Sequence, residues 1–292
     1  MADKNHLNMI ITGHIDNGKS TTMGHFLMDL GVVDERTIAA HAEESEKTGK
    51  GDTFKYAWVM DNIKDERERG ITIDLAFQKF ETPKFFFTLI DAPGHRDFIK
   101  NMITGASEAD AAVLVLSAKE GETDTAIAPG GQAREHAFLL KTLGVSQLIV
   151  AINKMDDSKF SEDAYNAAKA KGEQLVKSVG YKLDQVPFVP VSGWTGDNLV
   201  KKSENMPWYK GKTLLEAFDD FTAPEKPIGK PLRVPIQDVY SITGVGTVPV
   251  GRVETGVMKP GDKIVVMPSG APGEIKSIET HHTEMPKAEA GD

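Results

Sequence analysis

The chain has 292 residues, enough for two domains, and its formal net charge of −9 at pH 7 excludes the general positive charge of proteins that coat nucleic acids. It contains no cysteine, which excludes disulfide bonds and cysteine-ligated metals. The longest apolar runs, such as residues 111–116, are far too short to cross a membrane, and residues 1–5 show no signal-peptide pattern. These features predict a cytoplasmic protein without membrane partners.

Strand and helix patterns alternate from the N-terminus to about residue 221. The expected strands span residues 8–12, 71–80, 84–91, 109–116, 147–153 and 186–192. The expected helices span residues 19–30, 35–47, 54–68, 96–103, 132–143, 161–179 and 213–220. Such alternation predicts an α/β fold with an open, mostly parallel sheet, covered by helices on both faces. Ligands of such sheets bind at the carboxyl ends of the strands.

The composition changes after residue 221. Residues 222–231 are rich in proline and predict a stiff, extended linker. Beyond the linker about four short strand patterns alternate with Gly and Pro turns, which predicts part of a β-barrel. Four strands are too few to close a small barrel. We therefore expect an α/β domain at residues 1–221, a linker at residues 222–231 and a partial β-barrel domain at residues 232–292.

A phosphate-binding motif lies near the N-terminus. Residues 13–21 read G-x-x-x-x-G-K-S-T and lie between an expected strand and an expected helix. The glycines let the backbone wrap tightly, so that its N–H groups point at phosphate oxygens, and the helix N-terminus adds positive potential. Lys19 is placed to span the β- and γ-phosphates, and Ser20 to ligate Mg²⁺. A chance match is the alternative, and the strand–loop–helix context argues against it.

A second motif, D-x-x-G, occupies residues 91–94 at the end of an expected strand. Asp91 at that position can hold Mg²⁺ through water, and the N–H of Gly94 can meet the γ-phosphate. Alone, this motif arises by chance about once in a chain of this length. Its place at the end of a strand of the predicted parallel sheet makes it a candidate phosphate and metal site.

Two further motifs point to guanine. The N-K-M-D segment at residues 153–156 follows an expected strand, and Asp156 can accept two hydrogen bonds from N1–H and N2–H₂ of guanine. Adenine has no donors there, so buried pairing of this kind favours GTP by roughly 10⁴-fold. The stem of Lys154 can lie on one face of the base, and the S-G-W segment at residues 192–194 can close the pocket. Alone, Ser192 would be read as a strand-to-loop cap.

The order of these four motifs, each at a strand end, is typical of GTPases. The nucleotide-binding residues predicted from the sequence are Asp16, Asn17, Gly18, Lys19, Ser20, Thr21, Asp91, Gly94, Asn153, Lys154, Asp156, Ser192, Gly193 and Trp194.

Longer matches make the chain resemble the family of archaeal and eukaryotic elongation factor 1-alpha and bacterial elongation factor Tu. Besides the nucleotide motifs, the resemblance rests on residues 54–58, 66–74, 91–107, 131–136 and 246–254. It implies a translational GTPase that binds GTP with Mg²⁺ and delivers aminoacyl-tRNA to the ribosomal A site. Such a protein hydrolyses GTP to GDP on decoding, and a guanine nucleotide exchange factor restores GTP.

The resemblance also assigns roles to single residues. Thr72 would join Ser20 and Asp91 as a ligand of Mg²⁺ when the γ-phosphate is present. His95 would position the attacking water, and Lys19 and Thr72 would complete the catalytic set. Ile15 and Ile71 would form an apolar gate beside His95.

Two departures from the family pattern bear on the prediction. Asn17 stands where relatives usually carry His or Ser, and we expect this position to contribute mainly its backbone. The family also has a complete second barrel and a third domain, so we expect a chain truncated within the second domain that holds aminoacyl-tRNA poorly.

Two alternative functions remain open at this point. One is a related GTPase of termination or ribosome rescue, which is disfavoured because those relatives usually add an N-terminal extension. The other is a GTP-binding scaffold without independent catalysis. GTP turnover with and without ribosomes distinguishes the scaffold from the enzyme.

Overall fold

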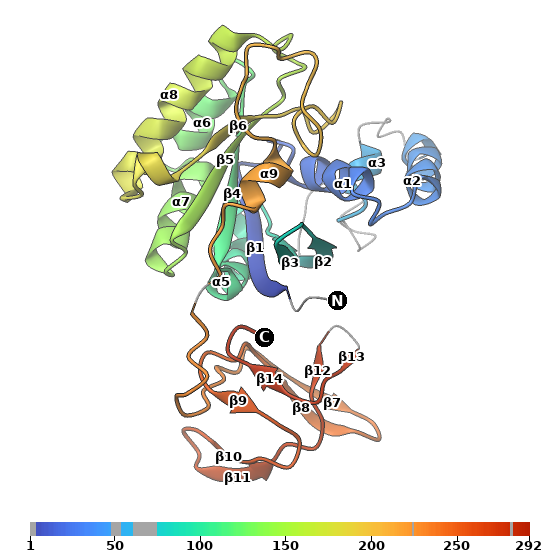
Figure 1. The fold of residues 1–292 in the computed structure, drawn as a ribbon, viewed down its shortest axis with the longest axis vertical. Helices are drawn as coiled ribbons and strands as arrows, with labels where there is room; N and C mark the ends of the chain where they lie inside the picture. Colours follow the sequence, from blue (N-terminus) through green and yellow to red (C-terminus); the bar gives the residue numbers. More distant parts are fainter. Residues whose placement is uncertain (1–3, 48–53, 61–74, 224, 281–282) are drawn as a thin grey trace. The chain divides into compact units, whose positions relative to one another are not determined.

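The structure is a computed structural model that describes residues 4–47, 54–60, 75–223, 225–280 and 283–292 (Figure 1). The chain divides into two compact units, Met1–Thr222 and Ala223–Asp292. Part of the expected linker is bonded to the segment just before β9 of the second unit: the carbonyl of Pro227 accepts from the N–H of Gly256 at 3.1 Å, and that of Pro231 from the hydroxyl of Thr255 at 2.6 Å.

The first unit is built on a six-stranded sheet with the order β2-β3-β1-β4-β5-β6. The strands β3, β1, β4, β5 and β6 are parallel, and β2 pairs antiparallel to β3 at the edge. The mostly parallel sheet expected from the sequence is therefore confirmed. The strand bounds are β1 Asn5–Gly13, β2 Ala76–Glu81, β3 Phe85–Asp91, β4 Ala111–Ser117, β5 Gln147–Asn153 and β6 Phe188–Pro190.

Helices cover both faces of this sheet. Their bounds are α1 Lys19–Asp29, α2 Glu35–Lys47, α3 Phe54–Ala57, α5 Ile99–Glu108, α6 Glu122–Ile127, α7 Gln132–Thr142, α8 Glu162–Val179 and α9 Leu214–Phe218, with 3₁₀ turns η1 Arg96–Phe98 and η2 Leu183–Gln185. Local chemistry sets several ends: Ser161 caps α8 by accepting from the N–H of Ala164, and Gly180 ends it at φ 94°. Among the described residues, no helix is long and apolar enough to cross a membrane.

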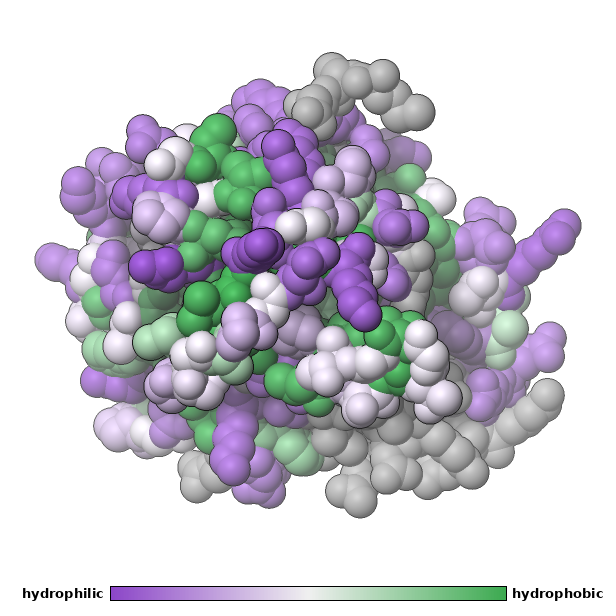
Figure 2. Space-filling view, turned by 90° about the horizontal axis from the view of Figure 1, so that it is seen from below, coloured by the Kyte–Doolittle hydropathy of each residue, from purple (hydrophilic) through white to green (hydrophobic). Residues whose placement is uncertain are grey.

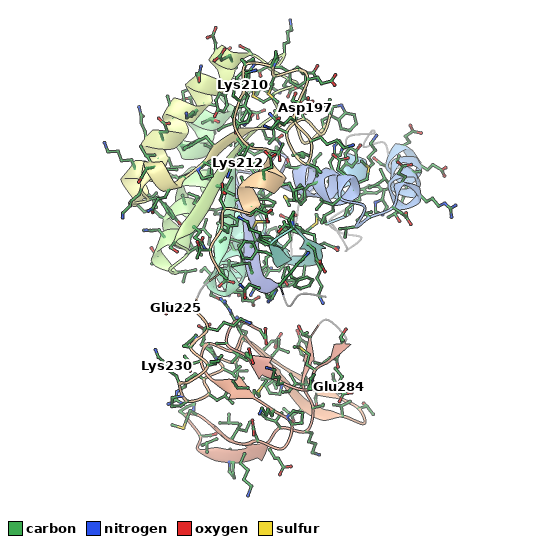
Figure 3. All side chains as sticks on the ribbon, viewed as in Figure 1. Asp197, Lys210, Lys212, Glu225, Lys230 and Glu284 are labelled. Carbon is green, nitrogen blue, oxygen red and sulfur yellow. The ribbon has the colours of Figure 1, made fainter. Side chains whose placement is uncertain are left out.

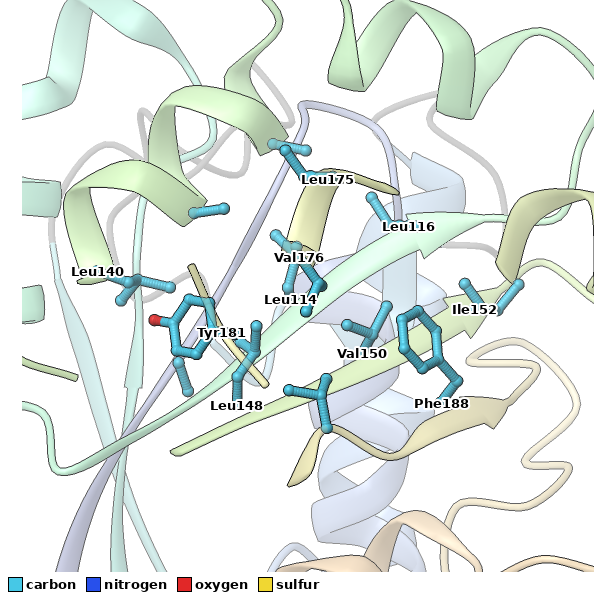
Figure 4. Close-up of a cluster of buried hydrophobic side chains, with 14 of the residues drawn as sticks. Leu114, Leu116, Leu140, Leu148, Val150, Ile152, Leu175, Val176, Tyr181 and Phe188 are labelled. Atoms are coloured by element: carbon cyan, nitrogen blue, oxygen red, sulfur yellow. The ribbon is translucent and has the colours of Figure 1, made fainter. Parts of the chain in front are cut away.

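The core lies on the two faces of the sheet. On one face, aliphatic side chains of β4 and β5 pack against α7 and α8, including Leu114, Val150, Leu140 and Val176 (Figure 4). On the other face, aromatic rings from α1, β2, β3 and α9 pack together, with ring centroids about 5 to 6 Å apart; these are Phe26, Phe80, Phe87 and Phe218. These two layers of side chains pack the sheet from both faces, so that the carboxyl ends of its parallel strands lie together at one end of the sheet.

Three elements differ from the sequence expectation. The helix expected at residues 54–68 ends at Ala57, and residues 58–60 form a turn in which Trp58, Val59 and Met60 are all buried. Three consecutive buried side chains do not fit a surface helix with one apolar face, and residues 61–68 lie outside the described residues. The expected helix at 96–103 begins with the turn η1 and continues to Glu108. Helix α6 was not expected.

The second unit consists of short antiparallel strands. The described residues form eight of them in four pairs, β7–β8, β9–β14, β10–β11 and β12–β13, rather than the four or so expected. Their bounds are β7 Asp238–Ile242, β8 Gly246–Val250, β9 Val257–Met258, β10 Lys263–Val266, β11 Ala271–Glu274, β12 Glu279–Thr280, β13 Thr283–Glu284 and β14 Ala288–Glu289. A small core surrounds Val253, Ile278 and Ala288. The face seen in Figure 2 carries apolar residues in small groups between hydrophilic ones.

Candidate functional site

The candidate site lies at the carboxyl end of β1, where the strand order reverses. Strand β1 has β3 on one side and β4 on the other, and open α/β sheets bind ligands outside such a switch point. Strand β1 ends at Gly13, and the chain turns through Asp16 at φ 60° and Gly18 at φ 79° before α1 begins at Lys19. Gly18 gives α1 no side-chain cap, and the N-terminus of the helix, with its positive potential, faces the loop that precedes it.

Lys19 and Gly94 bring the first two motifs together. The Lys19 side chain is buried, and its Nζ donates to the carbonyl of His14 at 3.0 Å. A Cβ at Gly94 would lie 2.4 Å from Nζ of Lys19 and 3.2 Å from the backbone nitrogen of Ile15. The D-x-x-G loop therefore runs directly against the phosphate loop, and the absence of a side chain at Gly94 is what permits this approach.

Two expected metal ligands meet beside the loop. The hydroxyl of Ser20 donates to Oδ2 of Asp91 at 2.7 Å, and Asp91 is fully buried at the end of β3. Hydroxyl and carboxylate oxygens of this kind suit Mg²⁺, which takes one or two protein ligands and completes its shell with phosphates and water. Within the described ranges, no group of three or more His, Cys, Asp or Glu side chains could hold a metal. Thr72, the third expected ligand, lies outside the described residues.

His95 lies next to Gly94 but is engaged in its own turn. Its Nδ1 accepts from the N–H of Asp97 at 3.2 Å, and its ring centroid lies 5.9 Å from that of Phe98. The side chain is 35% exposed, so it has room to change rotamer. Ile15, one side of the expected apolar gate, lies beside Gly94, whereas Ile71 lies outside the described residues.

The guanine motifs are joined by direct hydrogen bonds. The hydroxyl of Ser192 donates to Oδ1 of Asp156 at 2.6 Å, which ties the segment after β6 to the segment after β5. Nδ2 of Asn153 donates to the carbonyl of Asn17 at 2.8 Å, and its Oδ1 accepts from the N–H of Gly193 at 2.8 Å. Asn153, the first residue of the N-K-M-D segment, therefore links the phosphate loop to the S-G-W segment.

Lys154 is positioned by a residue that the sequence analysis missed. Its backbone takes the left-handed conformation at φ 62°, and its Nζ donates to Oε2 of Glu122 in α6 at 2.8 Å. Burial raises the pKa of Glu122, but hydrogen bonds from Lys154 and Ser117 outweigh it, and the pKa lies below its usual value. Glu122 thus stays ionised and holds the lysine stem. Its sequence context offers no motif, since only the fold brings α6 to the end of β5.

Trp194 packs against residues of α3. Its ring lies 6.0 Å from that of Tyr56, and Nζ of Lys55 lies 4.9 Å above it. Tyr56 in turn stacks on His25 at 4.1 Å, and Nδ1 of His25 lies 2.9 Å from the carbonyl of Gly193. The S-G-W segment is therefore held by the aromatic contact of Trp194 with α3 and by the contact of Gly193 with α1. His25 was not singled out in the sequence.

The loop after the S-G-W segment is shaped by Asp197 (Figure 3). Its carboxylate accepts hydrogen bonds from the hydroxyl of Ser203 and from Nδ2 of Asn205, the latter at 3.0 Å. Nδ2 of Asn198 donates to the carbonyl of Pro190 in β6 at 3.0 Å. These bonds fold the loop back on its own strand and so fix where Ser192 faces Asp156.

Helix α7 contacts the phosphate loop and the end of β1 through two of its side chains. Oε1 of Gln132 accepts from the N–H of Ile15 at 3.1 Å, and Nδ1 of His136 lies 2.7 Å from the hydroxyl of Thr12. Burial, reinforced by the charge of Lys19, lowers the pKa of His136 to about 3. His136 is therefore neutral beneath the loop near neutral pH.

This buried histidine predicts an acid-side loss of stability. Its ordinary pKa is 6.5, so below that pH the unfolded chain binds a proton that the folded chain excludes until the pH approaches 3. The contribution of His136 to the free energy of unfolding should thus fall by about 1.4 kcal/mol per pH unit below pH 6. Urea unfolding of the wild type and of His136→Gln between pH 7 and 5 measures this. The free energy of unfolding of the variant should fall less steeply with decreasing pH, by the equivalent of about one bound proton. Equal slopes in the two proteins would contradict a neutral His136.

The fold and site together define a P-loop GTPase: a phosphate loop, a Ser20–Asp91 pair and a bonded Ser192–Asp156 pair lie at the carboxyl ends of strands in a mostly parallel sheet. Residues 4–224 match the model of the elongation factor Tu GTP binding domain, and residues 246–292 match that of elongation factor Tu domain 2. The chain belongs to the elongation factor Tu family, and it is a translational GTPase, which hydrolyses GTP.

Named relatives agree with this assignment. The chain is 89% identical over 292 residues to elongation factor 1-alpha of Cenarchaeum symbiosum, covering 100% of this chain and 67% of that protein. It is 61% identical to elongation factor 1-alpha of Thermofilum pendens, covering 99% and 67%. Among solved structures, sup35 complexed with GMPPNP is similar, with a TM-score of 0.55, 33% identity, and coverage of 99% and 62%. The chain thus spans about two-thirds of the length of these relatives.

Proposed function

We propose that this chain binds GTP with Mg²⁺, takes part in delivering aminoacyl-tRNA to the ribosomal A site and hydrolyses GTP to GDP on decoding. The observation that carries the proposal is the bonded set of strand-end segments, in which Asn153 links the phosphate loop to the base-binding segments and Ser192 holds Asp156. This set supports a single ligand, a guanine nucleotide, whose phosphates would lie at the loop and whose base would lie beside Asp156. The family membership supports the ribosome and aminoacyl-tRNA as partners.

The metal proposal rests on the donor set. Ser20 and Asp91 already share a hydrogen bond at 2.7 Å, and we infer that they hold Mg²⁺ together with Thr72. When bound, the ion neutralises charge that develops on the phosphates. Lys19 would add a second positive charge between the phosphates, and Gly94 lies close against the phosphate loop, where its N–H would meet the γ-phosphate.

For hydrolysis we infer that His95 orients the attacking water. In the structure its Nδ1 is held by the N–H of Asp97, at 3.2 Å, inside its own turn. This bond holds the ring inside its own turn and leaves Nε2 to meet the water, so the orientation of this turn is a natural point of control by the ribosome. A guanine nucleotide exchange factor would then restore GTP, and the cycle would run in the cytoplasm.

The decisive experiment measures GTP turnover by the chain alone, with vacant ribosomes, and with ribosomes programmed with a sense codon plus aminoacyl-tRNA. We expect low turnover alone and strong stimulation by the sense-codon complex. Equal turnover in all three mixtures would favour the scaffold alternative. Stimulation by a stop codon instead of a sense codon would favour the termination alternative.

Removing the Lys19 amine should abolish tight nucleotide binding. Nζ of Lys19 is buried at the phosphate loop, so Lys19→Ala deletes the charge that faces the phosphates and leaves the loop carbonyl of His14 without this donor. Charge-assisted hydrogen bonds contribute about 1.5–3 kcal/mol each, so the Kd for GDP should rise by roughly 10²-fold or more. Fluorescent GDP titration measures this, with Lys177→Ala on the exposed side of α8 as control. A Kd unchanged by Lys19→Ala would remove the lysine from the phosphate site.

A further inference from the structure

The side chain of Asn17 is buried at the tightest point of the phosphate loop. Only 1% of the residue is exposed, although asparagine is usually found at the surface. Its Nδ2 donates to the carbonyl of Val115 in β4 at 3.0 Å, and its own carbonyl accepts from Nδ2 of Asn153 at 2.8 Å. The sequence expectation that this position contributes mainly its backbone therefore misses a side-chain bond.

The bond fills a gap in the sheet. The pairing of β1 with β4 ends at Gly13 opposite Val115, whereas β4 continues to Ser117. The chain that leaves β1 passes so close that a Cβ at Gly13 would lie 2.5 Å from the carbonyl oxygen of Val115. The amide of Asn17 donates to this oxygen at the place where strand pairing stops. A buried carbonyl that loses its donor is costly, so this bond fixes the path of the loop.

From these contacts we propose that the side-chain amide of Asn17 is a positioning residue that anchors the phosphate loop to β4 and so slows the release of the nucleotide. The inference rests on the proposed function. Gly18 and Lys19 follow Asn17 directly, so a shift at Asn17 moves the N–H groups and the amine that face the phosphates. The shift also reaches the base side, because Asn153 bonds both the carbonyl of Asn17 and the N–H of Gly193.

Two substitutions separate the donor from the volume of the side chain. Asn17→Leu keeps a similar volume and has no donor at any pH. Asn17→Asp keeps the shape, and its carboxylate lacks a donor at neutral pH but regains one when protonated. Burial raises the pKa of a carboxyl group, so lowering the pH favours the protonated form, which can donate.

The measurement is the dissociation rate of fluorescent GDP between pH 7.5 and 5.5, in the full chain. Loss of one buried hydrogen bond should speed GDP release about tenfold for both variants at pH 7.5. On acidification the excess rate of Asn17→Asp should fall back towards the wild type, whereas that of Asn17→Leu should persist. The pH profile of GDP release by the wild type is measured in parallel. It corrects for any pH effect of the titratable groups that all three proteins share, namely His14, Asp16 and Lys19 in the loop and His136 beneath it.

Asn166→Asp, on the exposed side of α8, is the control for the added charge and should release GDP like the wild type. Wild-type release rates in both Asn17 variants would overturn the inference. So would a fast Asn17→Asp whose pH profile parallels that of Asn17→Leu, since packing alone would then explain it. If circular dichroism shows Asn17→Asp to be unfolded, the rate of Asn17→Leu decides: faster release supports the anchor and an unchanged rate overturns it. A wild type that binds no GDP would instead refute the proposed function.

Discussion

Replacing Asp156 with asparagine should change the base preference of this chain from guanine to xanthine. Oδ1 of Asp156 accepts from the hydroxyl of Ser192 at 2.6 Å, so the carboxylate is fixed at the end of β5 before any base arrives. A carboxylate accepts from the N1–H and N2–H₂ of guanine, whereas an amide can donate to the 2-oxo group of xanthine. Mispaired buried polar groups discriminate by roughly 10⁴-fold, so the reversal should be large.

Competition binding of GTP, ATP and XTP against fluorescent GDP measures this change. Asp157→Asn is the matched control, because it makes the same substitution one residue further on, at a side chain that is 47% exposed. The control should keep the wild-type preference for GTP. An Asp156→Asn variant that prefers GTP as strongly as the wild type would show that the base binds elsewhere.

The parts of the site that could be predicted from the sequence are those in which chemistry and spacing lie within one segment. The phosphate loop needs its glycines and its lysine at fixed intervals between a strand and a helix, and both elements are present as expected. The strand Gln147–Asn153 and the helix Glu35–Lys47 also have the expected bounds. The strand is a short, continuous apolar run, which is typical of a parallel strand buried on both faces. Parallel strands then bring such segments to one edge.

The parts that could not be predicted depend on contacts between distant segments. Glu122 reaches Lys154 only because α6 lies beside the end of β5, and the amide of Asn17 finds Val115 only once β1 and β4 are paired. The two-residue strands of the second unit, such as Val257–Met258, are too short to show any period. For the same reason their number was underestimated.

His95→Ala should lower ribosome-stimulated GTP turnover by about 10²-fold or more while leaving the affinity for GTP nearly unchanged. The loss follows from removing the group that we propose orients the water, since a positioned acid–base or orienting side chain contributes about 10²–10⁴-fold. The unchanged affinity follows from the structure, because the imidazole is bonded to the N–H of Asp97 in its own turn and makes no hydrogen bond to the phosphate loop among the described contacts.

Single-turnover GTP cleavage on programmed ribosomes, together with the Kd for GTP, tests both halves of this expectation. His95→Gln serves as the conservative variant, because its amide can orient water but cannot exchange a proton near neutral pH. Partial activity in His95→Gln would assign the residue to orientation, and activity as low as in His95→Ala would assign it to proton transfer. Normal stimulated turnover in His95→Ala would remove His95 from the mechanism, and the hydrolytic water would then have to be placed by groups outside the turn that holds this histidine.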